Sequence, residues 1–226
     1  MKSVEEIAKE IERELLEKKI VNKLEYQDYY LLSTPDALNR KNIFIIVSGH
    51  PEIAGVWSNT LLSQGQLTAS SMESYFKAFH NEGWGLIALN PHLIQDDLVG
   101  TNYYNQIAQI LKDSKPESNL GFIGFSMGGR IIYDFLNSNN KILERTIAIV
   151  QIDPVIQQFK WDPSIIDLLK SKTILFASST DPYKFGIVSS HLLSISYLPI
   201  EGIHGTLPSK CLKEIIKFIK KEVENL

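Results

Sequence analysis

Ser126 is the residue whose setting in this sequence most directly suggests chemistry. It lies in the stretch LGFIGFSMGGR (120–130), with Gly124 two residues before it and Gly128 two residues after it. An apolar run of strand length precedes the serine, and helix-like residues begin near Met127. A serine on a tight turn between a strand and a helix exposes its Oγ, and its neighbours must be small because side chains there would collide with the adjacent strand or helix. A flexible glycine loop is the alternative, but the strand and helix signals favour a nucleophile elbow.

A histidine is needed to activate this serine. A serine hydroxyl is a weak nucleophile at neutral pH and requires a base within hydrogen-bond reach and an acid that orients the base. At nucleophile elbows the chain order is serine, acid, histidine. Of the five histidines, only His191 and His204 follow the serine. His204 comes just after the last strand-like run, in PIEGIHGTLPS, whereas His191 lies in a helix-like stretch, so His204 is the predicted base.

Two aspartates are candidates for the acid. Asp181 follows the run KTILFASST, and Asp153 follows the preceding run RTIAIVQI. Each precedes a proline, so each also fits a plain turn or helix-cap residue. Position in the chain leaves both open.

The oxyanion of a tetrahedral intermediate needs two backbone N–H donors. One is expected from Met127, the residue after the nucleophile. The other is expected from the loop after the run NIFIIVS (42–48), which reads SGHPEIAG. Pro51 has no N–H to donate, so His50 is the predicted second donor.

Alternating strand and helix signals predict the framework that positions these residues. Strand-like apolar runs occupy 42–48, 84–90, 120–126, 145–153, 172–179 and 195–201, and helix-like stretches occupy 71–83, 102–114, 127–139, 164–171 and 211–226. This alternation is typical of an α/β fold in three layers, with a doubly wound, mostly parallel sheet between helices. Residues 20–34 are expected to add one or two antiparallel edge strands. In such sheets, sites gather at the carboxyl ends of the strands.

Composition limits the class of protein. The chain has 226 residues, 44% of them hydrophobic and 22% charged, which fits a single globular domain over 1–226. A net charge of −3, with lysines that are interleaved with glutamates near the termini, argues against nucleic-acid binding. The single cysteine, Cys211, excludes an internal disulfide and is expected to be a half-buried apolar residue. No ligand cluster suggests a metal, and no cofactor is expected.

The N-terminal segment predicts a surface helix. Residues 1–20 carry many charges of both signs, with a capping-box pattern at Ser3 and Glu6 and an apolar face. We expect this helix to pack on the domain. It lacks the apolar core of a signal peptide, and no window of the chain is long and apolar enough to span a membrane. A cytoplasmic protein is expected.

The motif GFSMGG, with Asp181 and His204 downstream, resembles the α/β-hydrolase superfamily across about residues 40–226. In that superfamily the acid usually follows the later strand, which favours Asp181 and leaves Asp153 as the alternative. Only 18 residues, 154–171, separate Asp153 from the next run, so a minimal cap or none is expected. Residues 48–92 also resemble the argonaute-binding (Arb-type) domain, a branch of the same superfamily that is associated with binding roles.

The predicted function is that of a serine hydrolase for a small or medium ester or thioester. Ser126, Asp181 and His204 would form the triad, with the N–H groups of Met127 and His50 as the oxyanion hole. Two alternatives share the fold. One is a catalytically silent Arb-type module that binds a protein partner, and the other is an acyltransferase that uses the same triad.

Overall fold

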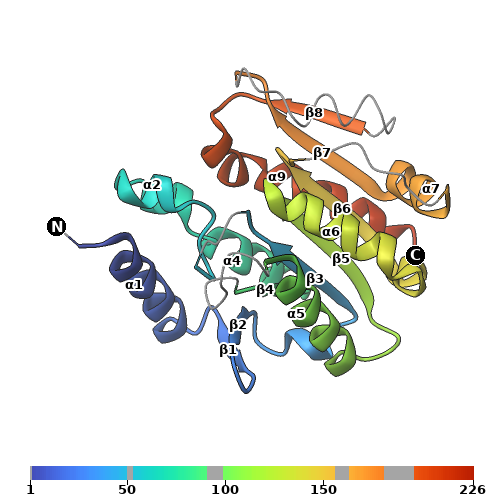
Figure 1. Ribbon diagram of the computed structural model, residues 1–226, viewed down its shortest axis with the longest axis horizontal. Helices are drawn as coiled ribbons and strands as arrows, with labels where there is room; N and C mark the ends of the chain where they lie inside the picture. The colour runs from blue at the N-terminus through green and yellow to red at the C-terminus, as the bar shows by residue number, and fades with distance from the viewer. Residues whose placement is uncertain (1, 50–52, 91–98, 156–162, 181–195) are drawn as a thin grey trace.

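The computed structural model describes residues 2–49, 53–90, 99–155, 163–180 and 196–226. Within these ranges the chain forms an eight-stranded sheet in the order β1-β2-β4-β3-β5-β6-β7-β8 (Figure 1). The strands are β1 (Asn22–Glu25), β2 (Tyr30–Ser33), β3 (Asn42–Val47), β4 (Gly85–Ala88), β5 (Asn119–Phe125), β6 (Thr146–Ile152), β7 (Thr173–Ser178) and β8 (Ser196–Ile200). All six predicted strands and both edge strands are therefore confirmed.

The direction of the strands brings the carboxyl ends of β3 to β8 to one edge. Strands β3 to β8 all run in the same direction, and β2 is antiparallel to both of its neighbours, β1 and β4. The central strands β3 and β6 are buried along their whole length. Burial on both faces explains why they appear in the sequence as continuous apolar runs without polar alternation.

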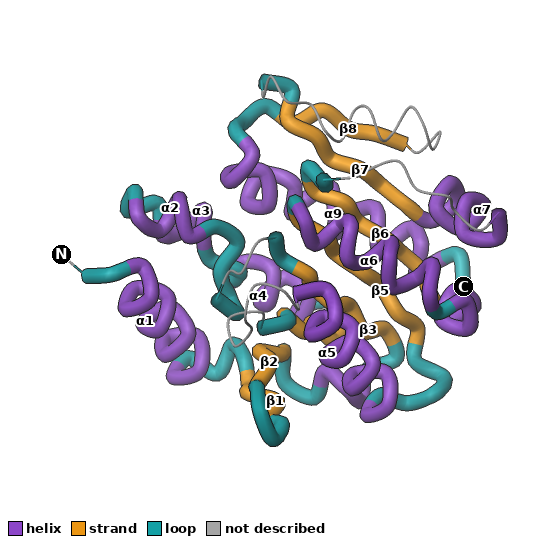
Figure 2. The backbone as a smooth tube through the Cα atoms, viewed as in Figure 1, coloured by secondary structure: helices purple, strands orange, loops and turns teal. Residues whose placement is uncertain are grey.

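Helices cover both faces of the sheet (Figure 2). Their bounds are α1 (Val4–Glu17), α2 (Asn59–Ser63), α3 (Leu67–Ser70), α4 (Glu73–Asn81), α5 (Val99–Asp113), α6 (Met127–Ser138), α7 (Pro163–Lys172) and α9 (Leu207–Glu224), with 3-10 turns η1 (Ala37–Asn39), η4 (Asn140–Arg145) and η5 (His204–Thr206). Buried side chains of α4 and α9 belong to one apolar cluster, and those of α5, α6 and α7 belong to another. The two clusters on opposite faces confirm the three-layer arrangement.

The N-terminal helix α1 is capped as its sequence predicts. Ser3 Oγ accepts from the Glu6 N–H, and the Glu6 carboxylate accepts from the Ser3 N–H. Ala8 and Leu15 are buried, and Ala8 belongs to a small apolar cluster with Val56 and other residues beside α2. The described helices contain no segment with the length and hydropathy that crossing a bilayer requires.

Three details differ from the sequence-based expectation. The short helices α2 and α3 were not predicted, because four or five residues are too few to show a helical repeat. Helix α9 begins at Leu207, four residues before the predicted start, since Pro208 fits the first turn of a helix. Cys211 is fully buried rather than half-buried, because it lies on the face of α9 that contacts the sheet.

Candidate active site

Ser126 lies between β5 and α6 in a strained backbone conformation. Its φ is 55° and its ψ is −122°, a region that residues with a side chain rarely adopt. Backbone hydrogen bonds hold it there: its N–H donates to the Ile152 carbonyl at 3.0 Å, and its carbonyl accepts from Gly129 N at 3.2 Å and Val155 N at 3.0 Å. The serine is half-buried. This is the strand–turn–helix geometry that a nucleophile elbow requires.

The glycines around Ser126 are required by close packing. A Cβ at Gly128 would lie 1.9 Å from the Val47 carbonyl oxygen, and one at Gly124 would lie 2.6 Å from the Cα of Gly129. A Cβ at Gly129 would lie 2.2 Å from Gln151 Oε1. Each of these distances is far shorter than any real carbon contact. The steric reason that the sequence suggests for glycine is the one that the structure gives.

His204 has a carboxylate partner at the same edge of the sheet. It opens the η5 turn after β8, and its Nδ1 lies 2.6 Å from Asp153 Oδ2. Asp153 follows β6 directly, is 3% exposed and has a φ of 44°. Its other oxygen accepts from the Ser178 N–H at 3.4 Å, and its own N–H donates to the Phe176 carbonyl at 2.7 Å. The carboxylate is therefore fixed on both sides, as the orienting acid of a histidine base must be.

The partner of His204 is thus Asp153, which the sequence ranked second. Asp181 and His50, the favoured acid and the second oxyanion donor, lie outside the described residues. Only the family resemblance favoured Asp181, since both aspartates follow strand-like runs and precede a proline. The contact between Asp153 and His204 joins residues 51 positions apart in the chain, so it appears only in the fold.

The ring of Phe125 connects the base to the elbow. It stacks on the His204 imidazole with ring centroids 4.7 Å apart and an interplanar angle of 25°. In the described part of the chain, no hydrogen bond joins Ser126 to His204, which is common in sites without substrate, where such bonds tighten only on binding. Met127 begins α6, and first-turn N–H groups of a helix lack intrahelical partners. Its N–H is therefore available to an oxyanion.

The loop after β3 begins against the serine. A Cβ at Gly49 would lie 3.0 Å from Ser126 Cβ. The hydroxyl of the buried Tyr103 donates to the Gly49 carbonyl at 3.2 Å. Sequence reasoning could not find this bond, because no local pattern links α5 to the end of β3.

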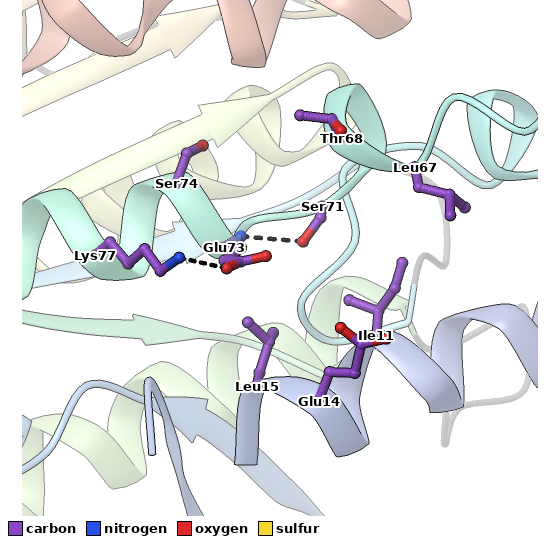
Figure 3. Close-up of a pocket in the computed structure, with 9 residues that line it drawn as sticks. All are labelled: Ile11, Glu14, Leu15, Leu67, Thr68, Ser71, Glu73, Ser74 and Lys77. Atoms are coloured by element: carbon purple, nitrogen blue, oxygen red, sulfur yellow. Dashed lines mark hydrogen bonds and ion pairs between the residues drawn. The ribbon is translucent and has the colours of Figure 1, made fainter. Parts of the chain in front are cut away.

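A cavity of about 380 Å³ lies elsewhere, between α1, α3 and α4 (Figure 3). Its walls include Ile11, Leu15 and Leu67, and its charged groups pair locally, as in the 2.5 Å contact of Lys77 with Glu73. Ser126, His204 and Asp153 are not among the residues that line this cavity. Among the described residues, no group of three or more histidines, cysteines and carboxylates is placed to hold a metal. The chemistry-bearing residues therefore gather at the sheet edge.

Comparison with known proteins gives structural likeness only. No protein-family model and no curated protein matches the sequence. The structure is similar to the histone deacetylase Clr3, with a TM-score of 0.66, 13% identity and coverage of 97% of this chain and 38% of that one. It is similar to a hyperthermophilic esterase from the archaeon Pyrobaculum calidifontis (TM-score 0.58, 12% identity, 98% and 94% covered). It is also similar to XC6422 from Xanthomonas campestris, a serine hydrolase without a lid, with a TM-score of 0.52, 13% identity and coverage of 91% of this chain and 93% of that one. At these identities the likeness concerns the fold, and the chain spans well under half of Clr3.

Proposed function

We propose that this chain, whose fold is the α/β-hydrolase fold, is a serine hydrolase that cleaves a small or medium ester or thioester. Ser126 is the nucleophile, His204 the base and Asp153 the acid. The observation that carries the proposal is the 2.6 Å contact between His204 Nδ1 and Asp153 Oδ2 beside a serine with a φ of 55°. A bound Nδ1 leaves Nε2 of the imidazole for the serine.

The proposed reaction has two steps. Ser126 Oγ attacks the carbonyl carbon while His204 takes the hydroxyl proton, and Asp153 stabilises the imidazolium that forms. The N–H of Met127 donates to the oxyanion, and the proposed second donor is His50. The intermediate collapses to an acyl-enzyme, and the leaving alcohol or thiol takes the proton from His204. His204 then takes a proton from water, whose oxygen attacks the acyl carbon. The bond from that carbon to Ser126 Oγ breaks, the imidazolium returns the proton to Oγ, and the acid is released.

The experiment that tests this proposal is labelling of the purified protein with a fluorophosphonate probe. Wild-type protein is expected to label, Ser126→Ala to lose the label, and His204→Ala to label at least a thousandfold more slowly, on the order of the loss seen when a triad member is removed. Ser138→Ala is the matched control, because it removes an exposed serine from the last turn of α6, the helix that follows Ser126. It should label like the wild type.

A silent binding module is the second candidate function. What favours it is the resemblance of residues 48–92 to the Arb-type domain, a branch associated with binding roles. A folded wild-type protein that does not label, and that hydrolyses no acyl ester from a short-to-long panel, would contradict the hydrolase and leave this candidate in the lead. An acyltransferase would label equally and would differ by consuming ester only when an alcohol or thiol acceptor is added.

A further inference from the structure

Phe125 is linked to both the proposed nucleophile and the proposed base. It directly precedes Ser126 in the chain, is 3% exposed, and lies nearly parallel to the His204 imidazole, with centroids 4.7 Å apart. The nucleophile and the surface on which the base rests are therefore consecutive residues of one strand end. Because Phe125 and Ser126 are adjacent, a shift of the backbone at one of them also moves the other.

The imidazole needs a second restraint besides its hydrogen bond. The His204 side chain is 38% exposed and extends from the three-residue η5 turn. A hydrogen bond from Nδ1 to Asp153 fixes one atom of the ring, but the ring can still rotate about the line that joins the two atoms. Contact between the face of the ring and Phe125 blocks that rotation, because a stacked plane cannot turn without losing the contact.

Other buried aromatic rings pack against the Phe125 ring. Trp57 meets it edge to face, with centroids 6.0 Å apart and an interplanar angle of 87°. Trp57 is fully buried and packs on Tyr75 at 4.8 Å, also edge to face. Packing of this density leaves few alternative rotamers. The surface under the histidine is therefore rigid.

We propose that Phe125 is a positioning residue for His204. Its ring sets the plane of the imidazole, so that Nε2 is directed to Ser126 Oγ while Nδ1 remains on Asp153. This inference rests on the proposed hydrolase function and adds to it the device that aligns the base.

Substitution on strand β5 tests the inference with a matched control. Phe125→Leu and Phe125→Met remove the ring, Phe125→Tyr keeps it, and Phe122→Leu makes the same change on the same strand. Phe122 is fully buried but belongs to the apolar cluster on the other face of the sheet. We expect the Leu and Met variants of Phe125 to lose about 10- to 100-fold in kcat with KM within about threefold, the size of loss that small misalignments cause. Phe125→Tyr and Phe122→Leu should stay within about threefold of the wild type in both constants.

Two results would overturn the inference. One is a kcat for Phe125→Leu and Phe125→Met close to that of the wild type. The other is an equal loss in Phe122→Leu, which would mean that any cavity in the core has the same effect. Urea unfolding of each variant identifies those that fail to fold.

A readout without turnover separates this inference from the proposed function. In an NMR spectrum of protein with labelled histidine, the His204 ring protons should carry a ring-current shift from Phe125, and the shift should vanish in Phe125→Leu but persist in Phe122→Leu. If the wild type shows this shift and does not label with fluorophosphonate, the hydrolase proposal fails while the stacked geometry stands. If the wild type labels and shows no such shift, the positioning inference fails alone.

Discussion

At the scale of single residues, each of the two proposed catalytic turns carries a residue in a strained backbone conformation. Ser126 and Asp153 both have positive φ values, 55° and 44°, and each directly follows one of two neighbouring strands, β5 and β6. The turns support each other, since Ser126 N donates to the Ile152 carbonyl and Val155 N donates to the Ser126 carbonyl. Backbone strain of this kind costs about 1–3 kcal/mol per residue and persists only where the surroundings enforce it. Lys19 and Asp36 have similar φ values in turns elsewhere, so what distinguishes this edge of the sheet is that its two strained turns are hydrogen-bonded to each other.

Replacing each candidate acid tests which aspartate orients the base. Asp153→Asn should lower kcat by roughly 10⁴-fold, because an amide cannot stabilise the imidazolium and favours the wrong tautomer. Asp181→Asn should lower it by less than about tenfold, as expected of a residue outside the triad. The measurement is steady-state hydrolysis of a p-nitrophenyl ester. The opposite ranking of the two variants would assign the acid to Asp181 and leave the Asp153 contact a structural one.

At the scale of elements, the close approach of α6 to β3 determines where the elbow sits. Gly128 lies in the first turn of α6, and a Cβ there would lie 1.9 Å from the Val47 carbonyl oxygen and 2.6 Å from that of Ser48. Helix propensity alone would favour alanine over glycine at this position by about 1 kcal/mol. Packing therefore outweighs propensity here, and it draws the N-terminus of α6 against the end of β3.

Gly128→Ala should destabilise the protein by about 3 kcal/mol or more, because backbone atoms on both sides must move. Gly83→Ala is the comparison: Gly83 has a φ of +74° and no atom within 4 Å of an added Cβ, so only conformational strain of about 1–2 kcal/mol is expected. Urea unfolding, followed by circular dichroism, gives both free energies of unfolding. A Gly128→Ala variant as stable as the wild type would show that α6 has room to withdraw from β3.

The fully buried Cys211 reports on how α9 is attached. Burial raises the pKa of its thiol to about 12, and the negative charge of Asp153 acts in the same direction. Because the thiolate is the reactive form, the native protein should react with iodoacetamide at pH 8 at least a hundredfold more slowly than a free thiol, and at the free rate in urea. Fast reaction in the folded protein would mean that α9 opens readily. Mass spectrometry measures the rate by following the fraction of chains that carry one adduct over time.

At the scale of the whole molecule, the sequence predicted the sheet well because parallel strands buried on both faces are long apolar runs that turns interrupt. It also placed Ser126 and Asp153 directly after strands, which is where the structure has them, whereas their catalytic roles remain proposals. It favoured Asp181 over Asp153 through the family resemblance alone, because the contact of Asp153 with His204 joins distant parts of the chain and leaves no local signal. Nor could it predict α2 and α3, whose helical form is imposed by neighbours such as η5 and α9 rather than by a repeat of their own.

Buried acidic groups also make the folded molecule retain protons at alkaline pH. Besides Cys211, burial raises the pKa of the fully buried Tyr75 and Tyr133 well above the usual tyrosine value of 10.0. In the unfolded chain these groups ionise at their ordinary values. Above those values the unfolded state binds fewer protons than the folded state, so rising pH favours unfolding. The free energy of unfolding should therefore decline as the pH rises above the ordinary thiol pKa of 9.0.

The thiol contribution can be isolated, because it begins one pH unit below that of the tyrosines. For Cys211 the loss should extend from the unfolded pKa of 9.0 to the folded pKa of about 12, at about 1.4 kcal/mol per pH unit once the unfolded thiol is ionised. Between pH 8 and pH 10, the free energy of unfolding of the wild type should fall by about 1.4 kcal/mol more than that of Cys211→Ala. Urea titrations of both proteins at the two pH values measure this difference, and it is independent of the constant cost of the alanine. Equal falls in the two proteins would mean that the thiol is solvated in the native state, contrary to its place on the buried face of α9.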